Sequence, residues 1–131
     1  PTYGTEFSAG ADLYACIEES SVVIAPGETV LIPTGLAMEI PEGYWGGIFA
    51  RSGLASKESL RPANCVGVAD SDYRGEYIVS LHNDSDTERT INPNDRIAQL
   101  VIMPFLTADF EVKEELSSTE RGSGGFGSTG K

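Results

Sequence analysis

The sequence predicts a single all-β domain, and three features of its 131 residues indicate that class. Short runs rich in valine, isoleucine and tyrosine recur along most of the chain, as they do in strands. Turn-forming groups such as Pro26-Gly27 and Pro41-Glu42-Gly43 separate these runs. The 15 glycines and 7 prolines also suit a chain with many turns. This regular spacing favours a sandwich, a jelly roll or an irregular barrel over alternating strands and helices.

Ten segments are expected to be strands, because each is short, apolar in pattern and bounded by turn signals. In chain order they are Asp12–Cys16, Ser21–Ala25, Glu28–Ile32, Gly35–Ile40, Tyr44–Phe49, Cys65–Ala69, Glu76–His82, Arg89–Ile91, Ile97–Pro104 and Asp109–Val112. No internal repeat or interdomain linker interrupts them. We therefore expect one domain over residues 1–131, with a β-rich body in 1–112 and a flexible C-terminal arm in 113–131.

One short helix is predicted over Ser52–Glu58, with Ser52 as its N-cap and good helix formers after it. Arg51 comes just before it. Free backbone N–H groups, a hydroxyl and a guanidinium would then meet at one spot, and together they could bind phosphate oxygens. From this segment alone, an ordinary capped surface helix is the better interpretation.

The charge balance argues against some classes of partner. Nine basic against 20 acidic residues give a formal net charge of −11. A general nucleic-acid surface needs a basic stripe, and an anionic membrane attracts basic segments, so we expect neither partner. A phosphate-bearing ligand remains compatible if the few cations are focused on its site, or if a divalent metal accompanies it.

The cysteines and the hydropathy indicate a compartment. Cys16 and Cys65 form no CxxC pattern, and with only His82 beside them they make no plausible zinc set. We expect both to be buried free thiols in a reducing cytosol. No secretory signal is visible, and the longest nearly apolar run, Ile97–Leu106, is too short to span a bilayer. We therefore expect a soluble, cytoplasmic protein.

The stretch Asn64–Asn83 concentrates groups that could do chemistry. Two runs rich in valine and isoleucine flank the polar segment Asp70–Gly75, a pattern typical of a β-hairpin with a long loop. Gly75 could supply the positive φ that such a loop usually needs. The loop could present a carboxylate base beside a flat aromatic surface. Taken alone, a solvated turn is the better interpretation.

The last eleven residues, Arg121–Lys131, combine five glycines with one phenylalanine. Gly125–Lys131 reads GxxxxGK, but a P-loop joins a strand to a helix and no helix follows this lysine, so we reject that interpretation. A disordered terminus and a flexible lid over an anion are the alternatives. The lid is favoured, because a lone Phe126 beside an arginine is an unusual choice for a solvated end.

Five segments, in this order, resemble the five motifs of the trimeric dUTP pyrophosphatases (dUTPases). They are AGADLYA (Ala9–Ala15), ARSGLA (Ala50–Ala55), NCVGVADSDYRGE (Asn64–Glu76), NDRIAQLVI (Asn94–Ile102) and RGSGGFGSTG (Arg121–Gly130). The resemblance implies distorted jelly-roll subunits in a homotrimer, with active sites shared between chains and the arm reaching a neighbour. It also implies Mg²⁺-dependent hydrolysis of dUTP to dUMP and pyrophosphate, which limits uracil incorporation into DNA.

The resemblance also assigns the catalytic groups. Asp70 resembles the carboxylate that orients and deprotonates the water attacking the α-phosphorus; an aspartate is ionised at neutral pH and so can act as a base. Gln99 resembles a glutamine near the phosphates and this water. Asp12 resembles an aspartate that contacts Mg²⁺ through water, and Mg²⁺ commonly keeps several waters while binding substrate phosphates.

The substrate-binding positions follow from the same resemblance. Tyr73 resembles the tyrosine that packs against deoxyribose and leaves no room for a 2′-hydroxyl. Asn64 and the backbone near Ile78 resemble the groups that read uracil. Arg121 resembles a γ-phosphate clamp and Phe126 the ring that covers uracil. The other implied substrate-binding positions are Arg51, Ser52, Gly53, Val68, Ala69, Gly127, Ser128 and Thr129.

Two positions depart from the family pattern. Ala69 stands where a bulky apolar residue is usual, which could loosen the packing behind Asp70. Asn94 replaces a frequent glycine, but asparagine tolerates the left-handed backbone, so we expect the turn to survive. Neither change removes a catalytic group.

Three other functions compete with dUTP hydrolysis. A dCTP deaminase of the same fold would need an acid–base residue beside the base, whereas the DSDYRG segment and the complete tail look like the hydrolase branch. A non-catalytic nucleotide-binding protein would not need Asp70, Arg121 and Phe126 together. A serine or cysteine hydrolase is disfavoured, because His82 is the one histidine and lies far along the chain from any nucleophile motif; we expect it to be structural.

Overall fold

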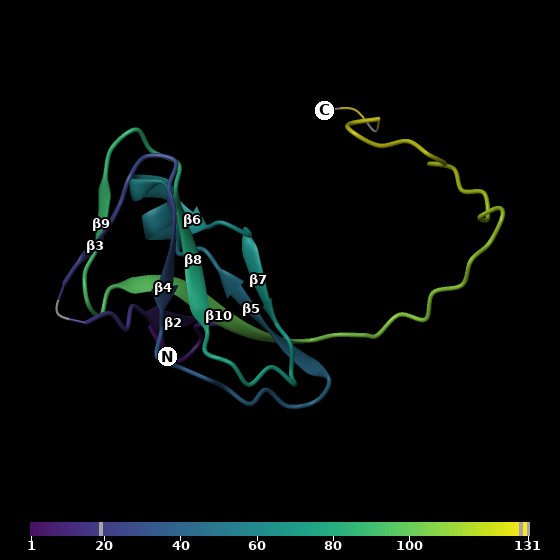
Figure 1. Ribbon diagram of the computed structural model, residues 1–131. Helices are drawn as coiled ribbons and strands as arrows, with labels where there is room; N and C mark the ends of the chain where they lie inside the picture. The colour runs from purple at the N-terminus through teal and green to yellow at the C-terminus, as the bar shows by residue number, and fades with distance from the viewer. Residues whose placement is uncertain (19, 129, 131) are drawn as a thin grey trace.

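Ten strands and one short helix are present in the computed structural model, which describes residues 1–18, 20–128 and 130. They are β1 (Thr2–Tyr3), β2 (Ala11–Tyr14), β3 (Val22–Ile24), β4 (Thr29–Pro33), β5 (Tyr44–Phe49), the helix η1 (Leu54–Glu58), β6 (Leu60–Pro62), β7 (Val66–Ala69), β8 (Ile78–Asn83), β9 (Arg89–Ile91) and β10 (Arg96–Pro104). The strands form three antiparallel sheets, in the orders β1-β2-β10-β5-β7, β3-β9 and β4-β8-β6 (Figure 1). The all-β, jelly-roll-like prediction is confirmed.

One hydrophobic core holds the three sheets together. Leu13 on β2, Ile24 on β3, Leu81 on β8 and Ile97 on β10 are each at most 1% exposed and belong to the same cluster. Along β8, buried residues alternate with more exposed ones, as expected for a strand with one face on a core. Each such side chain contributes about 1.5–3 kcal/mol through burial. The three sheets therefore share one core, and the edges of the sheets lie outside it, where they can contribute to a binding site.

The hairpin predicted for Asn64–Asn83 is wrong. Strand β7 pairs with β5 in the five-stranded sheet, whereas β8 pairs with β4 and β6 in the three-stranded sheet. The residues between them, 70–77, therefore cross from one sheet to another. Gly75 does not have positive φ. The local pattern located both strands correctly but carried no information on their partners, which lie far away in the sequence.

Two predicted strands are absent from the described chain and two others were missed. Gly35–Ile40 is not a strand: it crosses between sheets, with a left-handed Gly35 at its start. The carbonyl of Leu36 accepts from the Tyr77 N–H, and the Gly35 N–H donates to the Glu76 carboxylate, so the segment bonds to the 70–77 crossover without forming a ladder. Asp109–Val112 also forms no strand in this chain. The missed strands are β1, which has two residues, and β6, which ends in Pro62 and lies at a sheet edge, where proline is tolerated.

The helix differs from its prediction, while the Asn94 turn agrees with it. The helix is of the π type, its N-cap is Gly53, and no side chain caps it, so Ser52 is not the N-cap. Ser59 ends the helix in a left-handed conformation. Asn94 adopts φ 65°, so the left-handed turn expected for this asparagine is confirmed.

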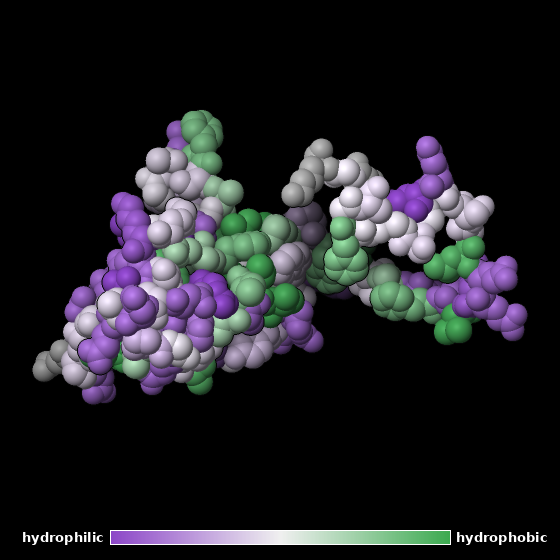
Figure 2. All heavy atoms as spheres, turned by 90° about the horizontal axis from the view of Figure 1, so that it is seen from above, coloured by the Kyte–Doolittle hydropathy of each residue, from purple (hydrophilic) through white to green (hydrophobic). Residues whose placement is uncertain are grey.

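Beyond β10 the chain leaves the body as an extended arm, which starts at Leu106 and so includes residues before the 113–131 expected from the sequence (Figure 1). Leu106, Phe110, Val112 and Leu116 in this arm are 87–99% exposed. Apolar side chains therefore stand out from the arm, as Figure 2 shows. In the part of the chain that the structure describes, no helix combines the length and apolar character needed to cross a membrane.

Candidate functional site

Six of the predicted site residues line one pocket of about 270 Å³ between β7, the 70–77 crossover and the start of β8. The crossover brings them together because it joins two sheets and so leaves a gap between their edges. Ile48, Gly67, Glu76 and Tyr77 complete the lining. The six predicted residues are Asn64, Val68, Ala69, Asp70, Tyr73 and Ile78.

The wall formed by β8 is an open strand edge. Strand β6 covers β8 from Leu81 to Asn83, and the N–H of Ala63 donates to the Ser80 carbonyl at 2.7 Å. In an antiparallel strand the N–H and C=O of one residue point to the same side, and so do those of the residue two positions away. The N–H and C=O of Ile78 therefore face the β6 side, where β6 has already ended. On the β4 side, the residue opposite Ile78 is Pro33, which has no N–H and so cannot donate a backbone hydrogen bond.

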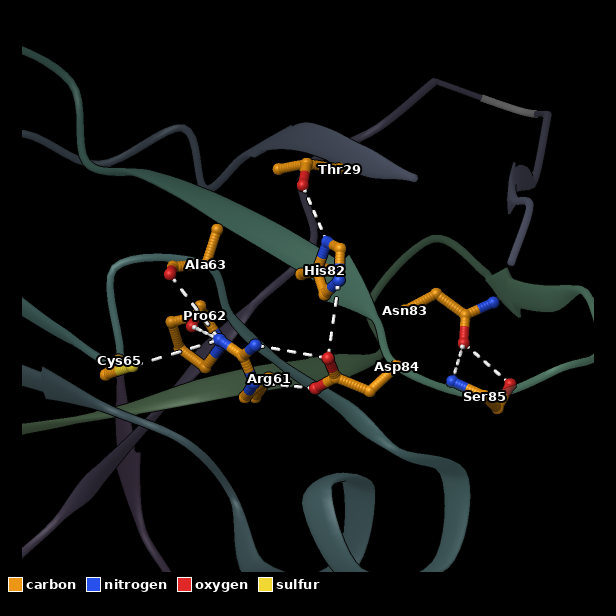
Figure 3. Close-up of polar contacts among 9 residues, drawn as sticks. All are labelled: Thr29, Arg61, Pro62, Ala63, Cys65, His82, Asn83, Asp84 and Ser85. Carbon is orange, nitrogen blue, oxygen red and sulfur yellow. Dashed lines mark hydrogen bonds and ion pairs between the residues drawn. The ribbon is translucent and has the colours of Figure 1, made fainter. Parts of the chain in front are cut away.

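Asn64 also lines the pocket and lies on a turn that Arg61 holds in place. The Arg61 guanidinium donates to the carbonyls of Pro62 and Ala63 at 3.3 and 3.4 Å. It also binds Asp84 through two nitrogens, at 2.6 and 3.1 Å (Figure 3). The carboxylate of Asp84 raises the pKa of Arg61, first by hydrogen bonding and then by its charge. This network fixes the backbone immediately before Asn64.

His82 belongs to the same network, in agreement with the structural role expected for it. The sheet order β4-β8-β6 places Thr29, His82 and Arg61 in one cross-strand row. A hydrogen bond of 2.8 Å joins Thr29 Oγ1 and His82 Nδ1, and His82 Nε2 lies 3.3 Å from Asp84 Oδ1 (Figure 3). Rows of this kind are the ordinary unit of sheet stabilisation.

The cysteine prediction is wrong in one respect. Cys16 and Cys65 are free, but both are exposed and not buried. Cys65 lies on the turn beside Asn64 with φ 64°, a conformation that places its side chain outside the core. Its Sγ is 3.8 Å from Arg61 Nη1 (Figure 3). Turn geometry thus outweighs the usual preference of cysteine for burial.

Tyr73 is held at the mouth of the pocket by its own loop. Its N–H donates to the Asp70 carbonyl at 3.2 Å, and its hydroxyl donates to the Glu76 carbonyl at 3.0 Å. Gly75 lets the ring lie this close, since a Cβ there would be 2.4 Å from Tyr73 Oη. Gly75 therefore serves to let the Tyr73 ring approach the backbone closely, and it does not supply an unusual φ.

Asp70 comes directly after β7 and is exposed where several hollows meet. It lines the small pocket and also a wider, open hollow of about 930 Å³ together with Ser71, Asp72 and Arg74. Asp72 lines the wide hollow but not the small pocket. Of the two loop carboxylates, Asp70 is thus the one that a ligand in the pocket could reach.

Asp12 and Arg51 form a second group. Arg51 Nε donates to Asp12 Oδ1 at 2.8 Å, and Arg96 Nη1 lies 3.3 Å from Asp12 Oδ2. The Asp12 and Arg51 side chains are 15% and 24% exposed, so the pair is largely buried. Gln99 is opposite Asp12 in the β2–β10 register and donates to the Ala50 carbonyl at 3.0 Å. Ser52 and Gly53 are exposed beside this group, at the start of the helix.

The arm residues form a third group, which does not line the small pocket. Arg121 Nε donates to the Gly124 carbonyl at 2.8 Å, so its guanidinium is held in a local turn. Phe126 is fully exposed with φ 49°, and Gly127 and Ser128 are exposed beside it. Thr129 lies outside the described residues. A single chain therefore brings the predicted site residues into three separate places.

Two residues at these places were not predicted from the sequence. Tyr77 is 3% exposed and lines the small pocket, but its position in an apolar run suggested ordinary core. Arg96 pairs with Asp12, although 84 residues separate them in the chain. The alternation of β8 could have marked Tyr77 as inward-facing, whereas no local signal predicts the contact of Arg96.

An all-β body with a pocket lined by an open strand edge, a tyrosine and a carboxylate defines a binding protein or enzyme for a small ligand with a hydrogen-bonding edge. The chain belongs to the dUTPase family, whose model matches residues 1–130. The resemblance read from the five segments is therefore confirmed.

Comparison with individual relatives gives the same family. The chain is 51% identical over 132 residues to the deoxyuridine 5'-triphosphate nucleotidohydrolase of Janthinobacterium sp. (strain Marseille), covering 100% of this chain and 88% of that protein. The structure of the Staphylococcus bacteriophage 80alpha dUTPase with dUpNHpp is similar at a TM-score of 0.88 and 32% identity, covering 100% of this chain and 91% of that one. A mutant dUTPase from phage phi11 of S. aureus, whose structure is described as revealing the coordination of a structural Mg(II) ion, has a TM-score of 0.78 and 28% identity, with 90% and 91% covered.

Proposed function

We propose that this protein hydrolyses dUTP to dUMP and pyrophosphate, and so limits uracil incorporation into DNA. The proposal rests on membership of the dUTPase family and on relatives named for this reaction. One observation of this chain carries it: the open backbone edge at Ile78 lines a small pocket together with Asn64, Tyr73 and Asp70. An enzyme acting on the nucleotide pool would work in the cytoplasm.

The open edge suits uracil. The C=O of Ile78 can accept from the ring N–H of uracil, and the N–H of Ile78 can donate to a uracil carbonyl, as in strand pairing. Cytosine presents an amino group where uracil has a carbonyl, so two donors would face each other and one would be left unpaired. The methyl group of thymine is expected to be excluded by close packing against the residues that line the pocket.

Tyr73 would select the sugar. Its ring lines the pocket and lies close to Gly75, and its hydroxyl donates a hydrogen bond to the Glu76 carbonyl. A deoxyribose packs against such a face, whereas a 2′-hydroxyl would collide with it. Rejection of ribonucleotides is then steric and does not require a charged group.

Asp70 would act as the general base. Its carboxylate takes a proton from a water molecule, the water oxygen forms a bond to the α-phosphorus, and the bond from that phosphorus to the bridging oxygen of the β-phosphate breaks. Pyrophosphate leaves with the electron pair of that bond. Gln99 would orient the water or the phosphates, and Arg51, Ser52 and Gly53 would bind phosphate oxygens. Exposure of Asp70 at the mouth supports its role.

The three groups of site residues support a homotrimer with shared active sites. One chain supplies the base pocket, the Asp12–Arg51–Gln99 group and the arm at separate places. Arg121 would clamp the γ-phosphate, Phe126 would cover uracil, and Gly127, Ser128 and Thr129 would add phosphate donors from a neighbour. Mixing an Asp70→Asn chain with a chain lacking residues 121–131 should restore activity; two inactive chains that stay inactive when mixed would contradict the sharing.

Mg²⁺ is proposed as the cofactor, held mainly by the substrate phosphates. No group of three metal-binding side chains occurs in residues 1–18, 20–128 and 130. Asp12 is the candidate contact, but both its oxygens already bind arginines, so it fits a metal only through water. When bound, the ion would neutralise phosphate charge. This matters for a chain of net charge −11 that must bind a triphosphate.

The decisive experiment measures pyrophosphate release from dUTP, with and without Mg²⁺, beside dTTP, dCTP and UTP as controls. We expect rapid Mg²⁺-dependent release from dUTP and little from the others. Ammonia released from dCTP would identify the deaminase instead. Tight dUTP binding without any product would identify a non-catalytic binding protein.

A further inference from the structure

Tyr77 is a buried aromatic residue whose backbone is fixed on both sides. Its N–H donates to the Leu36 carbonyl at 2.8 Å. Its own carbonyl accepts from the Thr34 N–H at 3.2 Å and from the Thr34 hydroxyl at 2.6 Å. Tyr77 itself is 3% exposed and belongs to the core cluster. It is therefore a rigid part of the body, although it also lines the small pocket.

The ring of Tyr77 meets the ring of Tyr73 edge to face. Their centroids are 5.8 Å apart and the planes are inclined by 70°, a favourable geometry for aromatic pairs. Tyr73 is 45% exposed and lies on a loop. Its other constraints are the hydrogen bonds of its N–H to the Asp70 carbonyl and of its hydroxyl to the Glu76 carbonyl, and the absence of a Cβ at Gly75. Of these, Tyr77 alone connects the Tyr73 ring to the core.

The hydroxyl of Tyr77 contributes nothing to this contact. It is buried without a hydrogen-bond partner among the described residues. Burial, with a smaller contribution from Tyr73, raises the pKa of Tyr77, so the group stays uncharged in neutral solution. A buried, unpaired hydroxyl costs stability. The ring, and not the hydroxyl, is thus the useful part of this side chain.

We propose that Tyr77 is a positioning residue for substrate selection: its ring holds the Tyr73 ring in the orientation that excludes a 2′-hydroxyl. This inference rests on the proposed function, in which Tyr73 packs against deoxyribose. Without the edge contact the Tyr73 ring can tilt on its loop and vacate part of the space that a ribose needs. The result is a change in sugar selectivity.

The test compares kcat/KM for dUTP and UTP in the full-length protein and three variants. Tyr77→Leu removes the aromatic edge and should lower the dUTP/UTP ratio about fivefold, in keeping with the strength of aromatic pairs. Tyr77→Phe keeps the ring and should keep the ratio within about twofold. Ile24→Val is a matched core control on β3, away from the pocket, and should also keep the ratio.

Each outcome decides the question. An unchanged ratio in folded Tyr77→Leu would overturn the proposal, as would an equal loss in Tyr77→Phe, which would assign the effect to the hydroxyl. If Tyr77→Leu does not fold, Tyr77→Met is measured in its place, because it keeps apolar volume without a flat edge. An unmodified protein inactive on dUTP would refute the proposed function instead. In that case NMR of labelled tyrosine rings still tests the positioning: the nuclear Overhauser contacts of the Tyr73 ring with its own loop should change in Tyr77→Leu and not in Tyr77→Phe or Ile24→Val, and unchanged contacts in Tyr77→Leu would overturn the proposal.

Discussion

The body and the C-terminal arm contain similar apolar residues, but the core of the body buries such residues and the arm exposes them. Leu81 on β8 is fully buried, whereas Leu116 in the arm is 87% exposed. Phe110 and Phe126 are exposed in the same way, although aromatic side chains gain much from burial. The body therefore buries one set of apolar residues in a core, although Phe7 and Val68 on it are exposed, whereas these apolar residues of the arm have no core to enter. This difference supports the proposal that the arm finds its partners on a ligand or on another copy.

The proposed chemistry divides along the same line. The body contributes the base pocket and the carboxylate, which are held by its sheets and need no other chain to take shape. The arm contributes Arg121 and Phe126, which touch none of the pocket residues in one chain. Four experiments on variants of the two regions test whether catalysis and folding separate as this division requires.

Asp70→Asn should have the largest effect. Removal of the general base is expected to lower kcat by about 10⁴-fold, while dUTP binding remains, because asparagine keeps the shape of the side chain. Pyrophosphate release and isothermal titration with dUTP measure the two quantities. Asp72→Asn, on the same loop but outside the small pocket, is the matched control. Near-normal turnover in Asp70→Asn would refute the base assignment.

Deletion of residues 121–131 should come next. Loss of the phosphate clamp and of the covering ring is expected to lower kcat/KM by about 10³-fold. The melting temperature should change by less than about 2 °C, because residues 121–128 and 130 contribute nothing to the core cluster. Steady-state kinetics and calorimetry on the same preparation give both numbers. A truncated protein with full activity would remove the lid from the mechanism.

Leu81→Ala and Leu116→Ala compare the two regions with one substitution. Leu81→Ala should lower the free energy of unfolding by about 3 kcal/mol, because it leaves a cavity in the core. Leu116→Ala should change it by less than about 0.5 kcal/mol, because the side chain is exposed. Urea denaturation measures both. Equal losses would mean that the arm packs on the body in solution.

Arg121→Lys should have the smallest effect, a fall in kcat/KM for dUTP of about tenfold. Lysine keeps the charge but lacks the planar fork that binds two phosphate oxygens at once. Inhibition by dUMP, which has no γ-phosphate, is the control and should stay as it is. If the lysine variant is as active as the parent protein, the arginine acts as a simple charge and not as a fork.

The sequence predicted the strands better than their pairing. The alternation in β8 and the apolar run of β10 were sufficient to locate both strands. The sheet assignment of β7 and β8 depends on β5, β4 and β6, which are distant in the sequence, so the hairpin prediction failed. β6 was missed because Pro62 argues against a strand unless its place at an edge is already known.

The candidate site was predictable for a different reason. The residues of the small pocket came from the resemblance to a family, since turn formers and carboxylates alone indicated a solvated loop. Arg96 and Tyr77 were not predicted, because contact with Asp12 and Tyr73 arises only when the sheets are assembled. A local sequence pattern therefore does not identify residues whose role depends on contact with another side chain.

The open edge of β8 also bears on how the protein avoids aggregation. Unpaired backbone on a strand is a template on which foreign chains can add and grow into larger assemblies. Here the open part of this edge is limited to Ile78, since Val79 faces β4, Ser80 is already bonded to Ala63 and the next residues pair with β6. Such a gap is long enough for a planar ring and too short for a peptide. The same shortness that admits a small molecule therefore keeps the surface inert towards other proteins.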